Sequence, residues 1–172
     1  MLETLLEAGA DASRTDADSL TPLETAITGE QPQAARFLIE QAPQAIAVAY
    51  PMLLRIMRDT KSPPLARQLC VEAVGQRGSA ATDSIPTLLN LLEAESRNLG
   101  HAAAEALANI DPKALTGQAI PYLSYILDGP LVQQGNADQQ WVANLYAARG
   151  DLYRLAGRSP QAMRDYETAL NH

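Results

Sequence analysis

The sequence predicts an all-α fold, a right-handed α-solenoid of stacked antiparallel helix pairs. Three apolar stripes, each opened by a proline, recur at a spacing of 35 residues, at 51–57, 86–92 and 121–127. A fixed period of this size is typical of one supersecondary unit stacked on copies of itself. The composition is rich in Ala and Leu, with one Trp, six Tyr and one Phe, which favours helices over strands.

Composition and charge narrow the class of function. The chain has 172 residues, is 47% hydrophobic and carries a formal net charge of −7. An acidic surface repels phosphates, so we expect no nucleic-acid partner. Cys70 is the only cysteine, which rules out a disulfide within this chain and fits a reducing compartment. The sequence shows no signal peptide and no apolar run long enough to span a bilayer, so we expect a cytoplasmic protein without membrane contact.

Residues 1–43 form the first predicted domain. Thr21 is placed to cap a helix that begins at Pro22, and Glu24 completes a capping box. A second short helix is expected from Pro32 to near Gln41. The segments 5–11 and 21–26 resemble the end of one ankyrin repeat and the start of the next.

Two residues in this domain depart from the ankyrin pattern. Glu24 replaces the usual His, so the capping box must substitute for the hydrogen bonds of that His. Ser19 stands where the family has a turn Gly, which predicts an altered or shortened hairpin tip. The resemblance implies a small hairpin turn without a true sheet.

Residues 44–129 form the second predicted domain. Residues 71–74 match residues 104–107 at an offset of 33, and a proline-led helix at Pro86 or Pro121 follows each. Small residues in the first helix and an apolar-Pro-x-Leu pattern in the second resemble HEAT-type repeats, with two full units and a half unit around Pro51. A single kinked helix running through Pro51 is the alternative.

Residues 130–172 form the third predicted domain, a loop followed by one repeat. The loop is expected over 129–140, with Trp141 packing across the joint. Residues 143–172 resemble a tetratricopeptide repeat through a set of small and aromatic residues: Tyr146, Gly150, Tyr153, Gly157, Ala162, Tyr166 and Ala169. Gly150 and Ala162 are expected to let the two helices approach closely, with Tyr rings beside them.

This last resemblance implies a groove lined by the first helix of the repeat. Carried onto this chain, the polar groove positions are Asn144, Asp151 and Arg154, which predicts contacts with an extended peptide. Families that clamp a terminal carboxylate use Asn and Lys where this chain has Asp151 and Ala148. That departure argues against a carboxylate clamp.

The sequence offers no catalytic motif, cofactor motif or metal set. A phosphate-binding glycine loop is absent, and one cysteine with two histidines cannot supply a zinc site. His101 is interpreted as a partly exposed helix residue and Cys70 as a buried thiol. Glu93 and Glu95 are interpreted as a solvated helix end.

The predicted function is a non-catalytic scaffold or adaptor that binds a protein or peptide partner. Because the repeats begin and end without capping units, a fragment of a longer repeat protein is expected, with possible self-association through the ends. Two alternatives stay open. One is a regulatory module of a larger enzyme or signalling protein, and the other is a relative of the bilin lyases that carry HEAT-like repeats.

Overall fold

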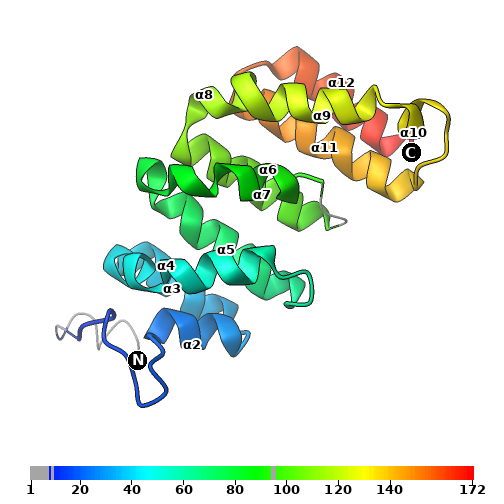
Figure 1. Ribbon diagram of the computed structural model, residues 1–172. Coiled ribbons are helices and arrows are strands. Elements are labelled where there is room, and N and C mark those ends of the chain that lie inside the picture. The colour runs from blue at the N-terminus through cyan, green and yellow to red at the C-terminus, as the bar shows by residue number, and fades with distance from the viewer. Residues whose placement is uncertain (1–7, 9, 94–95) are drawn as a thin grey trace. The chain divides into compact units, whose positions relative to one another are not determined.

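The computed structural model describes residues 8, 10–93 and 96–172 (Figure 1). Within these residues every regular element is helical, so the predicted all-α fold of paired helices is confirmed. No helix in this part of the chain combines the length and the apolar character needed to cross a membrane. The segment 5–9, which carries the start of the ankyrin-like pattern, lies outside the described residues apart from Ala8.

The chain divides into two compact units, Met1–Arg77 and Gly78–His172. The first unit contains four described helices: α2 (Pro22–Thr28), α3 (Pro32–Gln41), α4 (Pro43–Arg58) and α5 (Pro64–Gln76). A proline stands in the first turn of each, where the missing amide hydrogen has no partner within the helix to lose.

The predicted capping box at the start of α2 is confirmed. The Glu24 carboxylate accepts from the backbone amide of Thr21 at 2.7 Å, and Thr21 Oγ1 accepts from the amide of Glu24 at 3.3 Å. Just before it, the chain makes a tight turn in which Ser19 has a φ of 62°. Glycine adopts this left-handed conformation without strain, which explains why the ankyrin pattern has Gly where this chain has Ser19.

The expected helix start at Pro51 is wrong, and the single-helix alternative is confirmed. Helix α4 runs through Pro51. Its buried residues before and after the proline lie on one continuous face: Ala45, Ile46, Ala49, Leu53 and Met57. Packing of this face outweighs the loss of one helical hydrogen bond, although an internal proline costs about 3 kcal/mol.

Helices α4 and α5 form an antiparallel pair. Near their connection, the Arg67 guanidinium donates to the carbonyl of Met57 at 3.2 Å from Nε. At the end of α5, the Arg77 guanidinium lies 4.0 Å from the centre of the ring of Tyr50, in the middle of α4. The core of this unit consists mainly of fully buried aliphatic side chains: Leu23, Ile27, Leu38, Ile46, Leu53, Met57 and Leu69.

The second unit contains the remaining elements. They are η1 (Gly78–Ser84, 3-10), α6 (Ile85–Leu91), α7 (Arg97–Ile110), α8 (Pro112–Ala114), η2 (Leu115–Ala119, a π-helical turn), α9 (Ile120–Leu127), α10 (Pro130–Gln133), α11 (Gln139–Leu155) and α12 (Ser159–Leu170). Pro86 and Pro121 lie in the first turns of α6 and α9, as predicted.

The predicted loop over 129–140 is wrong in two parts, because it contains the short helix α10 and because α11 already begins at Gln139. Gly129 precedes it and Pro130 occupies its first position, so the Gly-Pro pair starts a helical turn instead of an open loop. A turn follows at Gly135, which has a φ of 69°. Asp138 then caps α11 by accepting from the amide of Trp141 at 2.8 Å.

Helices α11 and α12 form a second antiparallel pair, closed by Gly157 with a φ of 73°. The predicted close approach is confirmed, because a Cβ added at Gly150 would lie 2.6 Å from Cε1 of Tyr166. Arg149 strengthens the pair through two hydrogen bonds to Asp165, at 2.7 and 2.8 Å, and reaches Ser124 of α9 at 3.1 Å.

Candidate partner-binding surface

A buried carboxylate joins α7 to α11 and α12. Asp151 of α11 is only 3% exposed. Its Oδ2 lies 2.7 Å from the Arg97 guanidinium and 3.0 Å from Nδ1 of His101, both on α7. Its Oδ1 accepts a hydrogen bond from the Tyr166 hydroxyl of α12 at 2.7 Å.

These contacts set the charge state of Asp151. Burial alone raises the pKa of a carboxyl group, because the charged form loses its hydration. The ion pair with Arg97 and the hydrogen bonds from His101 and Tyr166 outweigh burial and hold the pKa of Asp151 below its usual value. The carboxylate is therefore charged at neutral pH and supplies a fixed negative group between three helices.

An exposed ion pair lies on the same side of α7 and α11. Arg154 contacts Glu105 at 2.5 Å, and His101 Nε2 lies 3.9 Å from the same carboxylate. The side chains of Arg154, His101 and Glu105 are between 41% and 47% exposed. We call the surface formed by Arg97, His101, Glu105, Asp151 and Arg154 the α7–α11 face.

The structure places the three predicted groove residues on one stripe of α11. Arg154 lies on the α7–α11 face and is exposed to a partner. Asp151 lies below it, engaged with α7 and α12. Asn144 lies two turns earlier, is 7% exposed, and accepts at Oδ1 from Gln140 at 3.3 Å. Peptide contact by these residues stays a prediction.

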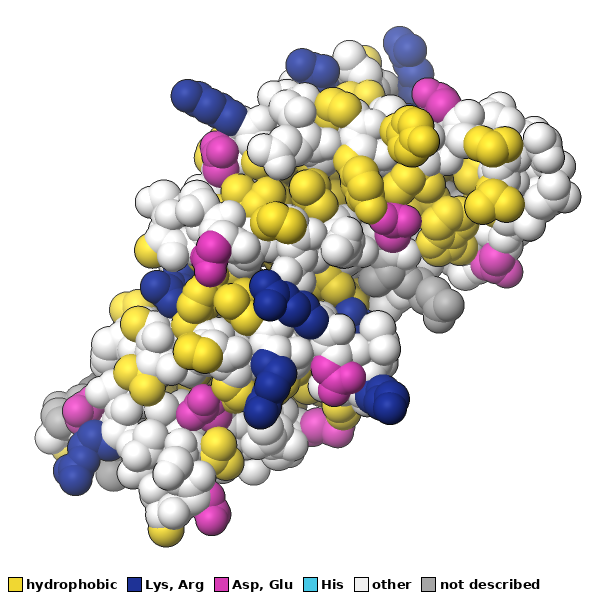
Figure 2. Space-filling view, viewed as in Figure 1, with side chains coloured by type: hydrophobic (Ala, Val, Ile, Leu, Met, Phe, Trp, Pro, Cys, Tyr) yellow, Lys and Arg dark blue, Asp and Glu magenta, His cyan; other side chains and the backbone are white. Residues whose placement is uncertain are grey.

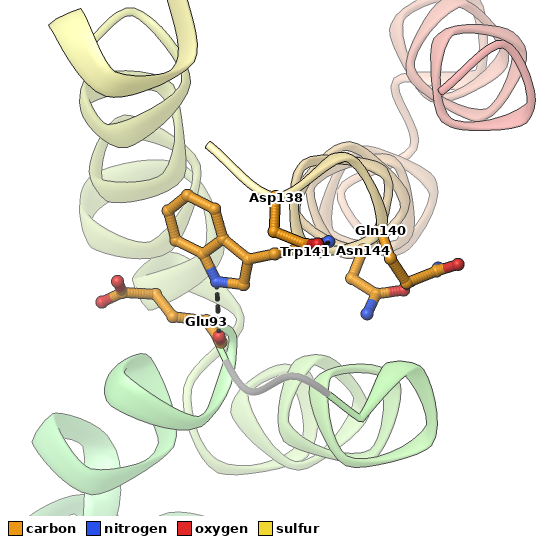
Figure 3. Close-up of a pocket in the computed structure, with 5 residues that line it drawn as sticks. All are labelled: Glu93, Asp138, Gln140, Trp141 and Asn144. Carbon is orange, nitrogen blue, oxygen red and sulfur yellow. Dashed lines mark hydrogen bonds between the residues drawn. The ribbon is translucent and has the colours of Figure 1, made fainter. Parts of the chain in front are cut away.

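Asn144 also lines a pocket at the start of α11 (Figure 3). The pocket has a volume of about 650 Å³, and its described lining residues are Glu93, Asp138, Gln140, Trp141 and Asn144. The indole nitrogen of Trp141 donates to the carbonyl oxygen of Glu93 at 3.0 Å. Trp141 thus ties α11 to the chain after α6, and this hydrogen bond does not cross the expected joint with the end of α9.

Glu93 is more than the solvated helix end that the sequence suggested. Its carboxylate accepts a hydrogen bond from the hydroxyl of Tyr122, on α9. Burial and this hydrogen bond raise the pKa of Tyr122 to about 12, so the phenol stays protonated and keeps donating. Glu95 lies outside the described residues.

Sequence reasoning missed the pairing of His101 with Asp151. The two residues are 50 positions apart and belong to different predicted repeats, so no local spacing links them. The ion pair of Arg149 with Asp165 was missed for a related reason, since it depends on the register between α11 and α12. The one signal in the sequence was the position of the Asp151 carboxylate on α11, on the same stripe as Asn144 and Arg154.

The chemistry available at this surface is recognition by charge and hydrogen bonds. Among the described residues, no three His, Cys, Asp or Glu side chains gather closely enough to hold a metal ion. Cys70 lies fully buried on α5, and burial raises the pKa of its thiol to about 12. A thiol with this pKa is a poor nucleophile at neutral pH.

Comparison with known proteins identifies one part of the chain. Residues 50–134 match the family model of HEAT repeats. No curated protein and no solved structure shows significant similarity to the chain. Helices α5, α6, α7 and α9 lie within the matched segment, and HEAT repeats generally act as protein-interaction scaffolds. The comparison therefore supports HEAT-type repeats over residues 50–134.

Proposed function

We propose that this protein is a non-catalytic scaffold or adaptor that binds a protein or peptide partner through the α7–α11 face. The observation that carries the proposal is the exposure of charged side chains on two neighbouring helices of a helical-repeat fold. Arg97, His101 and Arg154 offer hydrogen-bond donors, and Glu105 offers an acceptor. Stacked helical repeats characteristically use such extended surfaces for binding.

The proposal includes a finer repeat composition. An ankyrin-like domain over 1–43 is supported by the capping box of α2 and the left-handed turn residue Ser19. A tetratricopeptide-like repeat within 130–172 is supported by the contact of Gly150 with Tyr166. The HEAT-like domain between them, over 44–129, agrees with the family match over most of its length.

The proposal is tested by capturing partners on the purified chain and by comparing the wild type with a variant at Arg154. Arg154→Glu reverses a charge on the α7–α11 face and places it beside Glu105. Loss of about 1 kcal/mol of binding free energy corresponds to a roughly fivefold weaker complex. We therefore expect at least a fivefold lower recovery of the specific partner, measured by quantitative mass spectrometry.

The matched control is Arg164→Glu, the same charge change at an exposed position on α12. It should leave partner recovery unchanged. Equal recovery with wild type, Arg154→Glu and Arg164→Glu would reject the α7–α11 face. Circular dichroism and thermal unfolding of both variants show whether the fold is intact.

A further inference from the structure

A second surface of the same unit combines exposed hydrophobic side chains with carboxylates. Tyr125 on α9 is 81% exposed and Leu131 on α10 is 64% exposed. Figure 2 shows hydrophobic side chains in a band over α9 and α11, with acidic side chains among them. Isolated exposed apolar residues are ordinary, but a band of them on one face indicates a contact surface.

The surface formed by α9, α10 and the start of α11 is negatively charged. Residues 114–148, which include α9, α10 and the first half of α11, contain Asp128 and Asp138 but no Lys or Arg. Glu93 adds a third carboxylate at the pocket of Figure 3. The next residue, Arg149, reaches α9, but its charge is balanced by the ion pair with Asp165, so the three carboxylates leave this surface with an excess of negative charge that favours a positively charged group.

Trp141 lines the pocket and is held by two hydrogen bonds. Its indole nitrogen is bound to the Glu93 carbonyl at 3.0 Å, and its backbone amide is bound to Asp138 Oδ1 at 2.8 Å. In the view of Figure 3, the Glu93 carboxylate lies on one side of the indole and the carboxamides of Gln140 and Asn144 lie on the other. A held aromatic face loses little entropy when a ligand stacks on it.

We propose that this pocket binds an arginine side chain from a basic segment of the partner protein. A guanidinium is flat and always charged, so it can stack on the Trp141 indole while its N–H groups donate to carboxylate and carboxamide oxygens. The pocket of about 650 Å³ has room for the guanidinium and its aliphatic stem. This inference rests on the proposed partner-binding function and names the chemistry of the partner.

The test uses the intrinsic fluorescence of Trp141, which is the only tryptophan of the chain. Three capped peptides of alternating Ala and a charged residue, either Arg, Lys or Glu, are titrated into the full chain. The Arg peptide should give a saturable change in Trp141 emission that weakens as salt is added. The Lys peptide should bind about fivefold more weakly, because an ammonium cannot stack in the same way, and the Glu peptide should give no change.

Two conservative variants test the carboxylates without disturbing the fold. Asp138→Asn keeps a good helix-capping residue at the start of α11, and Glu93→Gln keeps an acceptor for Tyr122. Together they should weaken Arg-peptide binding by about tenfold or more, because two charge contacts are lost. The matched control is Glu167→Gln, which neutralises an exposed carboxylate on α12 and should change nothing.

Three results would overturn the inference: no change in Trp141 emission with the Arg peptide, equal binding of the Lys peptide, or equal binding by the double variant. Each would leave the proposed scaffold function standing if partner capture still depends on Arg154. Loss of the Arg154 effect with retained Arg-peptide binding would instead reject the α7–α11 face and keep the pocket. The two failures are therefore distinguishable.

Discussion

Asp151 is the residue on which the packing of α7, α11 and α12 converges. Its two oxygens contact three side chains from α7 and α12. The sequence predicts a peptide-binding role for this residue, and the structure adds an internal one that its position on α11 could not show. A carboxylate that is buried and fully engaged stabilises the fold only while it is charged.

The pKa of Asp151 predicts how this stabilisation depends on pH. Because the folded pKa lies below the usual Asp value of about 4, the contribution is complete above about pH 5, declines as the unfolded state takes up a proton, and is lost as the pH falls through the folded pKa. Asp151→Asn should lower the free energy of unfolding by about 1–3 kcal/mol at pH 7. The difference from wild type should shrink towards pH 2 in urea denaturation.

Asp128→Asn is the control for this pH dependence. Asp128 is exposed at the end of α9, so its neutralisation should change stability by no more than about 0.5 kcal/mol at either pH. A difference between Asp151→Asn and wild type that stays the same from pH 7 to pH 2 would mean that the carboxylate charge has no part in holding the helices.

At the scale of elements, the close contact of α11 with α12 depends on Gly150. A methyl group there would lie 2.6 and 2.8 Å from two ring carbons of Tyr166, whose hydroxyl is held by Asp151. Gly150→Ala should therefore destabilise the protein by about 1–3 kcal/mol, despite the higher helix propensity of Ala. Thermal unfolding should show a melting temperature lower by several degrees.

Gly117→Ala makes the same chemical change at a position where no neighbouring heavy atom lies within 4 Å. It should leave the melting temperature unchanged or slightly raised. If Gly150→Ala is as stable as Gly117→Ala, then α11 and α12 can separate at no cost, and the tight approach is not important for the fold.

Signals within a few residues of sequence predicted most of the helix starts. They failed where contacts between distant parts of the chain determine the structure. Prolines in first turns and the capping box of Thr21 with Glu24 marked helix starts correctly, because these signals act within a few residues. Pro51 was misread because a continuous buried face holds α4 together across it. The pairing of Glu93 with Tyr122 could not be predicted, since it depends on how α6 and α9 pack.

At the scale of the whole molecule, the boundaries of the compact units do not coincide with the boundaries between the repeat patterns of the sequence. Helices α2 and α3 pack against α4 and α5 in one compact unit, whereas the repeat patterns change near residue 43. A pattern match reports which residues face a neighbour, but it does not identify the neighbour. The boundaries between repeat types therefore stay predictions, while the helical content and the HEAT-type stretch are observed.

The central claim is that helices α7 and α11 together present the surface that a partner covers. Amide hydrogen exchange of the chain, alone and in the complex recovered by partner capture, tests this directly. We predict slower exchange within Arg97–Ile110 and Gln139–Leu155, and unchanged exchange within Ser159–Leu170. Protection confined to α12, or the same exchange in both helices with and without partner, would contradict the account.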